Sequence, residues 1–114
     1  MSAAAAPEPT VDQTLAALAD PVRRRVVELL AQRPMRPGEM AQELGASASS
    51  LSKHLRVLRL RGLVSESHPE FDARVRIYTL RSAPMVELRA WLETAERGWA
   101  QQLAAFVEFA EGAQ

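Results

Sequence analysis

The sequence predicts a mainly α-helical fold with one small β-hairpin, in a chain of 114 residues. Three observations predict it. Apolar residues recur every three or four positions through most of the chain, which is typical of amphipathic helices. Proline and glycine divide this pattern into short helices joined by turns. One stretch, residues 63–80, alternates apolar and polar residues instead, as a half-buried hairpin does.

The chain begins with residues 1–10, MSAAAAPEPT, which we expect to be a disordered tail. Residues 11–18 predict a first short helix. Asp20 stands where an N-cap belongs and Pro21 at the first helical position, so a second helix starts there and continues over VRRRVVELLAQ. Two prolines in residues 34–37 then end it, because proline does not fit a helix interior.

The next two helices are separated by a tight turn. Pro37 opens a helix over residues 37–44, and Gly45 follows as a left-handed C-cap. Ser47 is placed as the N-cap of the following helix, because its hydroxyl can accept a hydrogen bond from a first-turn amide. Gly62 ends that helix.

The helix after Ser47 has two different faces. At 100° per residue, three leucines fall within about 60° of one another and form a stripe that should be buried. These are Leu51, Leu55 and Leu58. The opposite face carries small hydroxyls and cations, namely Ser49, Ser52, Lys53 and Arg56. Small side chains let a helix start approach a partner closely, and its free amides favour a negatively charged one.

Residues 63–67 and 74–80 predict the two strands of the hairpin, joined by HPEFDA. Side chains alternate along the second strand, which places Val75 and Ile77 on one face. The other face carries Arg74, Arg76 and Tyr78. The hairpin therefore adds two cations to the surface.

Pro84 opens a last helix of about 26 residues, which would span roughly 39 Å. This is longer than a small domain needs to cover its own core. Apolar residues step by threes and fours along it, so we expect residues 83–114 to be a dimerisation helix. The candidate dimer contacts are Leu88, Trp91, Leu92, Ala95, Trp99, Leu103 and Phe106. Lining a small-molecule pocket is the alternative role for the two tryptophans.

Charge is segregated along the chain although the net charge is zero. Residues 22–80 hold eleven Arg or Lys against six Asp or Glu, a net charge of +5, whereas the flanks hold three against eight, a net charge of −5. Thirteen of the fourteen cations are arginine, whose planar guanidinium suits phosphate. A cationic central region between acidic ends is typical of nucleic-acid binding.

Several classes of protein are disfavoured or excluded. The chain has no cysteine, which excludes disulfides, thiolate metal sites and a cysteine nucleophile, and favours the cytoplasm. No segment approaches the roughly 18 apolar residues of a membrane span, so we expect no membrane partner. Ser49 and His54 point apart on one helix with no acid placed to orient the histidine, so we expect neither an enzyme nor a cofactor.

A helix, a turn, a helix with a polar outward face and then a basic hairpin is the order of a winged helix-turn-helix, here over residues 11–82. In the helix-turn-helix the second helix enters the major groove of double-stranded DNA, where its first residues meet base edges. Cations further along pair with phosphates, which supply affinity without sequence information. The candidate DNA contacts are Ser47, Ala48, Ser49, Ser52, Lys53, Arg56, Arg74 and Arg76.

Three segments resemble the ArsR family of bacterial winged-helix transcriptional repressors: LADPVRRRVVELL, GEMAQELGASASSLSKHLRVLRLRGLV and RVRIYTL. The stretch LRAWLETAERGWAQQLAAF resembles the branch with a tryptophan-bearing C-terminal helix and no metal site. The resemblance implies a homodimer built from the first and last helices, acting at an inverted-repeat operator. It also implies that base edges are met by Ala48, Ser49, Ser52 and Lys53. Two positions depart from the family pattern: Ala48 replaces a frequent glutamine, and PEFDA replaces a short glycine turn in the wing.

Some residues keep more than one role. His54 lies beside the leucine stripe, which favours a half-buried structural role over contact with DNA or an effector. His68 precedes a proline in the hairpin, where we expect it to be solvated. A phosphate contact and simple solvation are both open for Arg23, Arg24 and Arg25. No histidine occurs in residues 85–110, so we do not expect transition-metal sensing.

Two alternative functions stay open at this point. A winged-helix module for protein contacts would need an apolar outward face on the second helix, where serines and cations stand instead. A regulator that responds to a small molecule would need an effector pocket at the dimer interface. The sequence names neither an effector, an operator nor the regulated genes.

Overall fold

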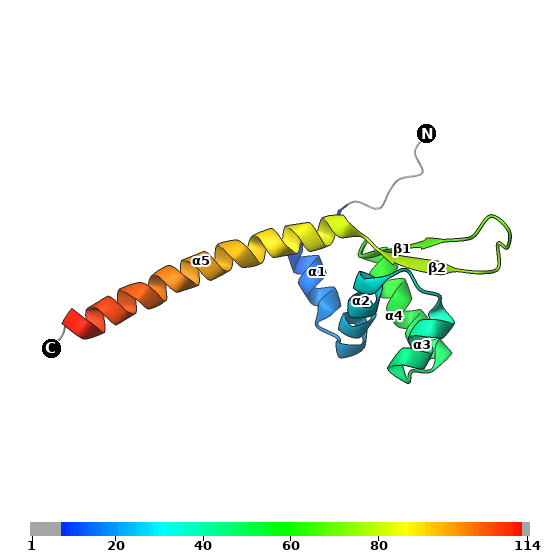
Figure 1. Ribbon diagram of the computed structural model, residues 1–114, viewed down its shortest axis with the longest axis horizontal. Coiled ribbons are helices and arrows are strands. Elements are labelled where there is room, and N and C mark those ends of the chain that lie inside the picture. Colours follow the sequence, from blue (N-terminus) through cyan, green and yellow to red (C-terminus); the bar gives the residue numbers. More distant parts are fainter. Residues whose placement is uncertain (1–7, 113–114) are drawn as a thin grey trace.

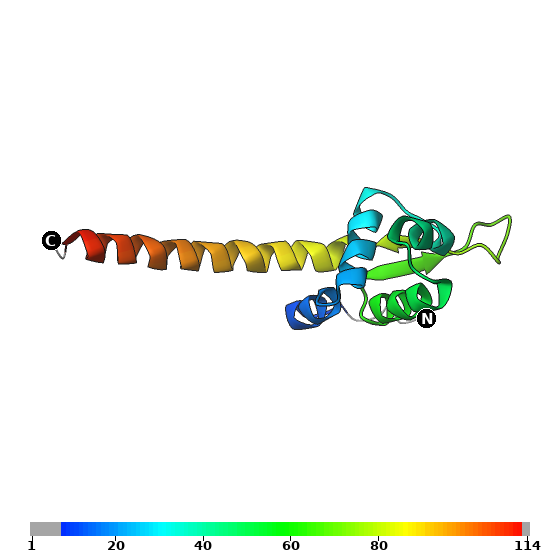
Figure 2. The ribbon, with the colours of Figure 1, turned by 90° about the horizontal axis from the view of Figure 1, so that it is seen from below.

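The computed structural model describes residues 8–112, which form five helices and one two-stranded antiparallel sheet. In chain order the elements are α1 (Val11–Leu18), α2 (Pro21–Gln32), α3 (Pro37–Leu44), α4 (Ala48–Leu60), β1 (Val64–Ser67), β2 (Ile77–Leu80) and α5 (Ser82–Gly112). Figure 1 shows α1 to α4 and the hairpin in one body, from which α5 extends as a long rod. Turned by 90°, Figure 2 shows the hairpin pointing away from the free end of α5. The predicted winged helix-turn-helix is confirmed.

The predicted helix caps are confirmed. One carboxylate oxygen of Asp20 accepts hydrogen bonds from the amides of Val22 and Arg23, at 2.8 and 3.1 Å. Gly45 has a φ of 62°, the left-handed conformation that a residue without a Cβ adopts readily. The hydroxyl of Ser47 accepts from the amide of Ser50 at 3.2 Å. These caps set where α2, α3 and α4 begin or end, and so the angle of the turn between α3 and α4.

The core lies where α4 meets α2, α3 and the hairpin. The leucine stripe of α4 is buried as predicted, at 0 to 2% exposure for Leu51, Leu55 and Leu58. Around it the structure buries Val26, Leu30, Met40, Leu63 and Val64. Because the leucine side of α4 packs in the core, the opposite side of the helix faces solvent.

The second strand is shorter than predicted. It covers Ile77–Leu80 rather than residues 74–80, and its register pairs Val64 with Leu80 and Ser67 with Ile77. The carboxylate of Asp72 accepts a hydrogen bond from the amide of Arg74. The backbone carbonyl of Asp72 accepts another from the amide of Val75, and the chain bends into a turn there. Arg74 and Arg76 therefore lie in the loop of the hairpin and not on a pleated strand.

Tyr78 was expected on the outward face, and that expectation is wrong. Its side chain is 3% exposed, and its backbone exchanges two hydrogen bonds with Met35 in the link between α2 and α3, at 2.9 and 3.1 Å. Since residues 74–76 are not extended in the sheet, the alternation read from them does not carry into β2. The tyrosine belongs to the core.

Two predicted boundaries also shift. α5 begins at Ser82, two residues before Pro84, and has 31 residues rather than about 26. Of the predicted tail, residues 1–7 lie outside the described part. Residues 8–10 are held in the fold, because Pro9 is buried and Thr10 exchanges two hydrogen bonds with Gln13 as a capping box for α1.

Candidate nucleic-acid interface

The outward face of α4 is free to meet a partner. Ser49, Ser52, Lys53 and Arg56 are all exposed, opposite the buried leucines. Among the described residues, the side chains of Ser52, Lys53 and Arg56 take part in no hydrogen bond or ion pair. Ala48 is exposed at the first position of α4, whereas the hydroxyl of Ser47 is occupied by its cap. The structure thus gathers five of the eight predicted DNA contacts on one accessible surface, with Ser47 beside them.

The base of the wing borders the same surface. A cleft of about 90 Å³ separates α3, α4 and β2, and residues from all three elements line it. Ala48 and Ser52 form its α4 side, Gly38 stands at the start of α3, and Arg76 lies on the wing side. Arg76, just before β2, therefore borders the same cleft as two of the predicted DNA contacts on α4.

Arg74 lies further out on the wing. Its side chain is 91% exposed and pairs with the carboxylate of Asp72, with the guanidinium Nε 3.2 Å from an Asp72 oxygen. The amide of Arg74 donates to that same oxygen. The bond from the Arg74 amide, and after it the bond from the Arg74 side chain, hold the pKa of Asp72 below its ordinary value. The wing thus presents Arg76 near α4 and Arg74 near its tip.

The carboxylate of Glu66 joins the wing to α4, a role that no motif in the sequence indicated. It accepts a 2.6 Å hydrogen bond from the buried hydroxyl of Tyr78. It also lies 3.7 Å from the guanidinium of Arg59, in the last turn of α4, and 3.3 Å from His68. His68 is exposed, as expected, and its ring also hydrogen-bonds the carbonyl of Val75 across the loop at 2.9 Å.

Acid is expected to loosen this junction. The hydrogen bond from Tyr78 lowers the pKa of Glu66 from its ordinary value of 4.5, so the native state favours the carboxylate. The stabilisation is complete above the pKa of Glu66 in the unfolded chain and is lost as the pH falls through its pKa in the folded protein.

We expect the thermal midpoint to drop on acidification below about pH 4.5, and less steeply in Glu66→Gln than in the wild type. Thermal unfolding between pH 7 and 3 checks this, with Glu28→Gln as the exposed control; equal slopes in all three proteins would contradict it.

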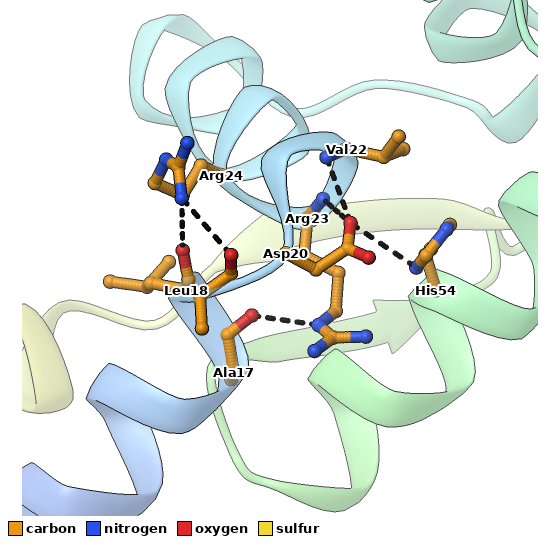
Figure 3. A network of polar contacts seen from close by, with 8 residues as sticks. Ala17, Leu18, Asp20, Val22, Arg23, Arg24 and His54 are labelled. Atoms are coloured by element: carbon orange, nitrogen blue, oxygen red, sulfur yellow. Dashed lines mark hydrogen bonds and ion pairs between the residues drawn. The ribbon is translucent and has the colours of Figure 1, made fainter.

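Two of the three consecutive arginines serve the fold. Figure 3 shows Arg23 and Arg24 turned back onto the end of α1, where they donate to the carbonyls of Ala17 at 2.7 Å and Leu18 at 2.9 Å. They satisfy carbonyls that the end of α1 leaves without helix partners. Arg24 and Arg25 are exposed, and a phosphate contact by any of the three arginines stays a prediction.

His54 has the half-buried position that the sequence favoured. In Figure 3 its ring points to the Asp20 cap of α2, with Nδ1 3.9 Å from the carboxylate. The same carboxylate accepts two backbone amides, which is the main reason that the pKa of Asp20 is lowered. The contact links α4 to the start of α2, on the side of α4 that packs against the core.

The far part of α5 carries an apolar stripe with no partner in the chain. Every residue from 91 to 112 is exposed, including the predicted dimer contacts Trp91, Leu92, Ala95, Trp99, Leu103 and Phe106; Leu88 is half-buried. Trp99, for example, is 67% exposed. An exposed stripe of this length marks an interaction surface. Nearer the body, a groove of about 380 Å³ lies between α2, β2 and α5, lined by residues including Leu30, Met85 and Arg89.

No three side chains of the metal-binding types come together between residues 8 and 112. Within the same range, no helix is both long and apolar enough to span a membrane.

Known proteins resemble this chain in sequence and in structure. A family model described as "Bacterial regulatory protein, arsR family" matches residues 20–66, from the α2 cap through α4 into β1. The HTH-type transcriptional regulator Rv2034 of Mycobacterium tuberculosis is 36% identical over 97 residues, which cover 85% of each chain.

Two solved structures share the fold over nearly the whole domain. An ArsR-like transcriptional regulator from Rhodococcus sp. RHA1 superposes with a TM-score of 0.69 at 26% identity, covering 88% of this chain and 92% of that one. A crystal structure described as a possible transcriptional regulator for arsenical resistance gives a TM-score of 0.66 at 35% identity, covering 84% and 96%. The resemblance found in the sequence is confirmed: the chain belongs to the ArsR family of DNA-binding transcriptional regulators.

Proposed function

We propose that the protein is a homodimeric, sequence-specific repressor that binds an inverted-repeat operator, in the cytoplasm where bacterial DNA lies. The observation that carries this proposal is the outward face of α4. It offers small hydroxyls at the helix start and cations one and two turns along, on a helix whose other side is fixed in the core. This is the arrangement by which a recognition helix enters the major groove.

The contacts divide into residues that face bases, called readers below, and residues that bind phosphates. Ala48, Ser49, Ser52 and Lys53 stand in the first turns of α4 and face base edges. A serine hydroxyl can donate or accept a hydrogen bond, so it discriminates weakly between bases. Ser49 and Ser52 each therefore contribute at most the lower end of the roughly 1 to 3 kcal/mol of a good base contact. Phosphates are contacted by Arg56, Arg74 and Arg76. Specificity therefore comes from several weak readers and affinity from arginines.

Two copies assemble through α1 and the stripe of α5. Pairing the stripes removes from water the large side chains that α5 now exposes, among them Trp91, Trp99 and Phe106. A two-fold axis through this contact presents the two α4 helices about 34 to 36 Å apart, one turn of DNA, to successive major grooves. An operator with inverted half-sites follows from that symmetry. An effector pocket at the dimer interface stays a prediction from the sequence.

A gel-shift titration tests DNA binding directly. The labelled probe is the 250 or so base pairs upstream of the protein's own coding sequence, and a scrambled duplex of equal length and composition is the competitor. We expect retention at nanomolar protein that excess scrambled DNA does not remove, since specific affinities typically exceed non-specific ones by about 10³ or more. Equal competition by the two duplexes would contradict sequence-specific binding.

Operator affinity is expected not to respond to metals or oxidants. The sequence has no cysteine, and the described residues hold no cluster of metal-binding side chains. Zinc, nickel, arsenite and hydrogen peroxide should each change the dissociation constant by less than twofold. The measurement is the same titration with and without each agent. A tenfold loss that a chelator or a reductant reverses would show a sensing site that this account lacks.

A further inference from the structure

The tip of the wing is an ordered structure that presents one aromatic ring. The amide of Asp72 donates to the carbonyl of Pro69 at 3.2 Å, which closes a turn with Glu70 and Phe71 at its centre. A second turn follows directly, closed by the amide of Val75 and the carbonyl of Asp72 at 3.2 Å. The side chain of Phe71 is 83% exposed at the apex of the first turn.

A single exposed apolar side chain is ordinary, but here hydrogen bonds fix the loop on both sides of Phe71. Besides the two turns, the carboxylate of Asp72 fixes the amide of Arg74, and His68 bonds the carbonyl of Val75 across the base. Glu66 holds His68 in turn. The ring is thus held out from the body by bonds on both sides of it.

The tip lies at the end of the molecule where α4 would meet DNA. Figures 1 and 2 both show the wing extending on the side of α3, away from the free end of α5. Arg76, at the base of the loop, lines the same cleft as Ala48 and Ser52 of α4.

Charge alone does not account for the tip. Residues 69–74 hold Glu70, Asp72 and Arg74, a net charge of −1, and Asp72 is paired with Arg74. Beside the exposed guanidinium of Arg74, the tip offers the apolar ring of Phe71. Deoxyribose and base edges in the minor groove are the apolar surfaces that duplex DNA offers, and phenylalanine is among the side chains that wedge against them.

We propose that Phe71 is a DNA contact in its own right, packing against sugar and base edges of the minor groove beside the major groove that α4 occupies, with Arg74 next to it. The proposal rests on the proposed function, because it places the tip at the DNA that α4 binds. It makes the wing a reader of groove shape, which varies with sequence.

The test compares full-length variants on the upstream duplex and on the scrambled duplex at several salt concentrations. Phe71→Ala is expected to weaken binding to the upstream duplex about tenfold with the salt slope unchanged, because the lost contact carries no charge. Phe71→Leu, which keeps a wedge, should recover most of the affinity. Leu60→Ala removes a similarly exposed side chain, 67% exposed at the end of α4, and should change nothing.

Glu70→Gln provides a second readout that does not depend on the ring. If the tip lies within a Debye length of the phosphates, about 10 Å at 0.1 M salt, loss of this carboxylate raises affinity for both duplexes. If Phe71→Ala and Glu70→Gln bound within twofold of the wild type while Arg56→Ala was still impaired, the wing contact would be wrong and the proposed function would stand. No effect of Arg56→Ala either would show instead that the proposed function is wrong.

Discussion

Leu103→Glu is expected to convert the protein to a monomer and to weaken binding to the upstream DNA by a hundredfold or more. Leu103 stands in the middle of the α5 stripe, between Trp99 and Phe106. In the proposed dimer a carboxylate there is buried among apolar side chains, and an unpaired buried charge is strongly unfavourable. A monomer then loses the second half-site and the affinity gained by binding both together.

Sedimentation at micromolar concentration and the gel-shift titration measure the two effects. Gln101→Glu is the matched control, since it adds the same charge to an exposed residue of α5 two positions away, on the other side of the helix. The DNA-binding body should still unfold cooperatively in both variants, because residue 103 lies outside its core; the midpoint of Leu103→Glu should fall only by what dimerisation contributed. A Leu103→Glu protein that stays dimeric and binds as the wild type does would rule out the stripe as the interface.

Arg56→Glu is expected to weaken binding to the upstream and the scrambled duplex together, by well over tenfold each. The side chain lies exposed on the outward face of α4, one turn beyond Ser52, where a phosphate contact supplies affinity but no sequence information. Reversal removes that contact and sets a carboxylate against the phosphate. The slope of log affinity against log salt should fall by about one unit or more.

The control for this substitution is Arg97→Glu, the same charge reversal at an exposed position of α5, off the apolar stripe. It changes the net charge equally and should alter neither the salt slope nor the affinity beyond twofold. If Arg97→Glu weakened binding as much as Arg56→Glu, the effect would be one of total charge and not of a contact at α4.

The helix-turn-helix could be predicted from the sequence because local chemistry decides it. The cap at Asp20, the left-handed Gly45 and the cap at Ser47 each act within a few residues, and the spacing of the leucines fixes which side of α4 is buried. Once those are known, the exposed face follows. The eight candidate DNA contacts remain predictions, but six of them are on or beside α4 as expected.

The wing could not be predicted because contacts distant in sequence shape it. Alternation in residues 74–80 suggested one long strand, yet the Asp72 turns and the His68 bond to Val75 end the pairing early. Tyr78 faces inward because it meets Met35, more than forty residues before it, and Glu66. In the same way, nothing in the local sequence shows that Arg23 and Arg24 bind the end of α1.

Sequence-specific binding through α4 is the central claim, and one measurement tests it most directly. The dissociation constants of the wild type, Ser52→Ala, Lys53→Ala and Arg56→Ala are determined on the upstream and scrambled duplexes between 50 and 200 mM salt, or about that range. We expect Ser52→Ala and Lys53→Ala to lower the ratio of specific to non-specific affinity, and Arg56→Ala to lower both affinities with the ratio preserved. A wild-type ratio near one, or ratios and salt slopes unchanged in all three variants, would contradict the claim.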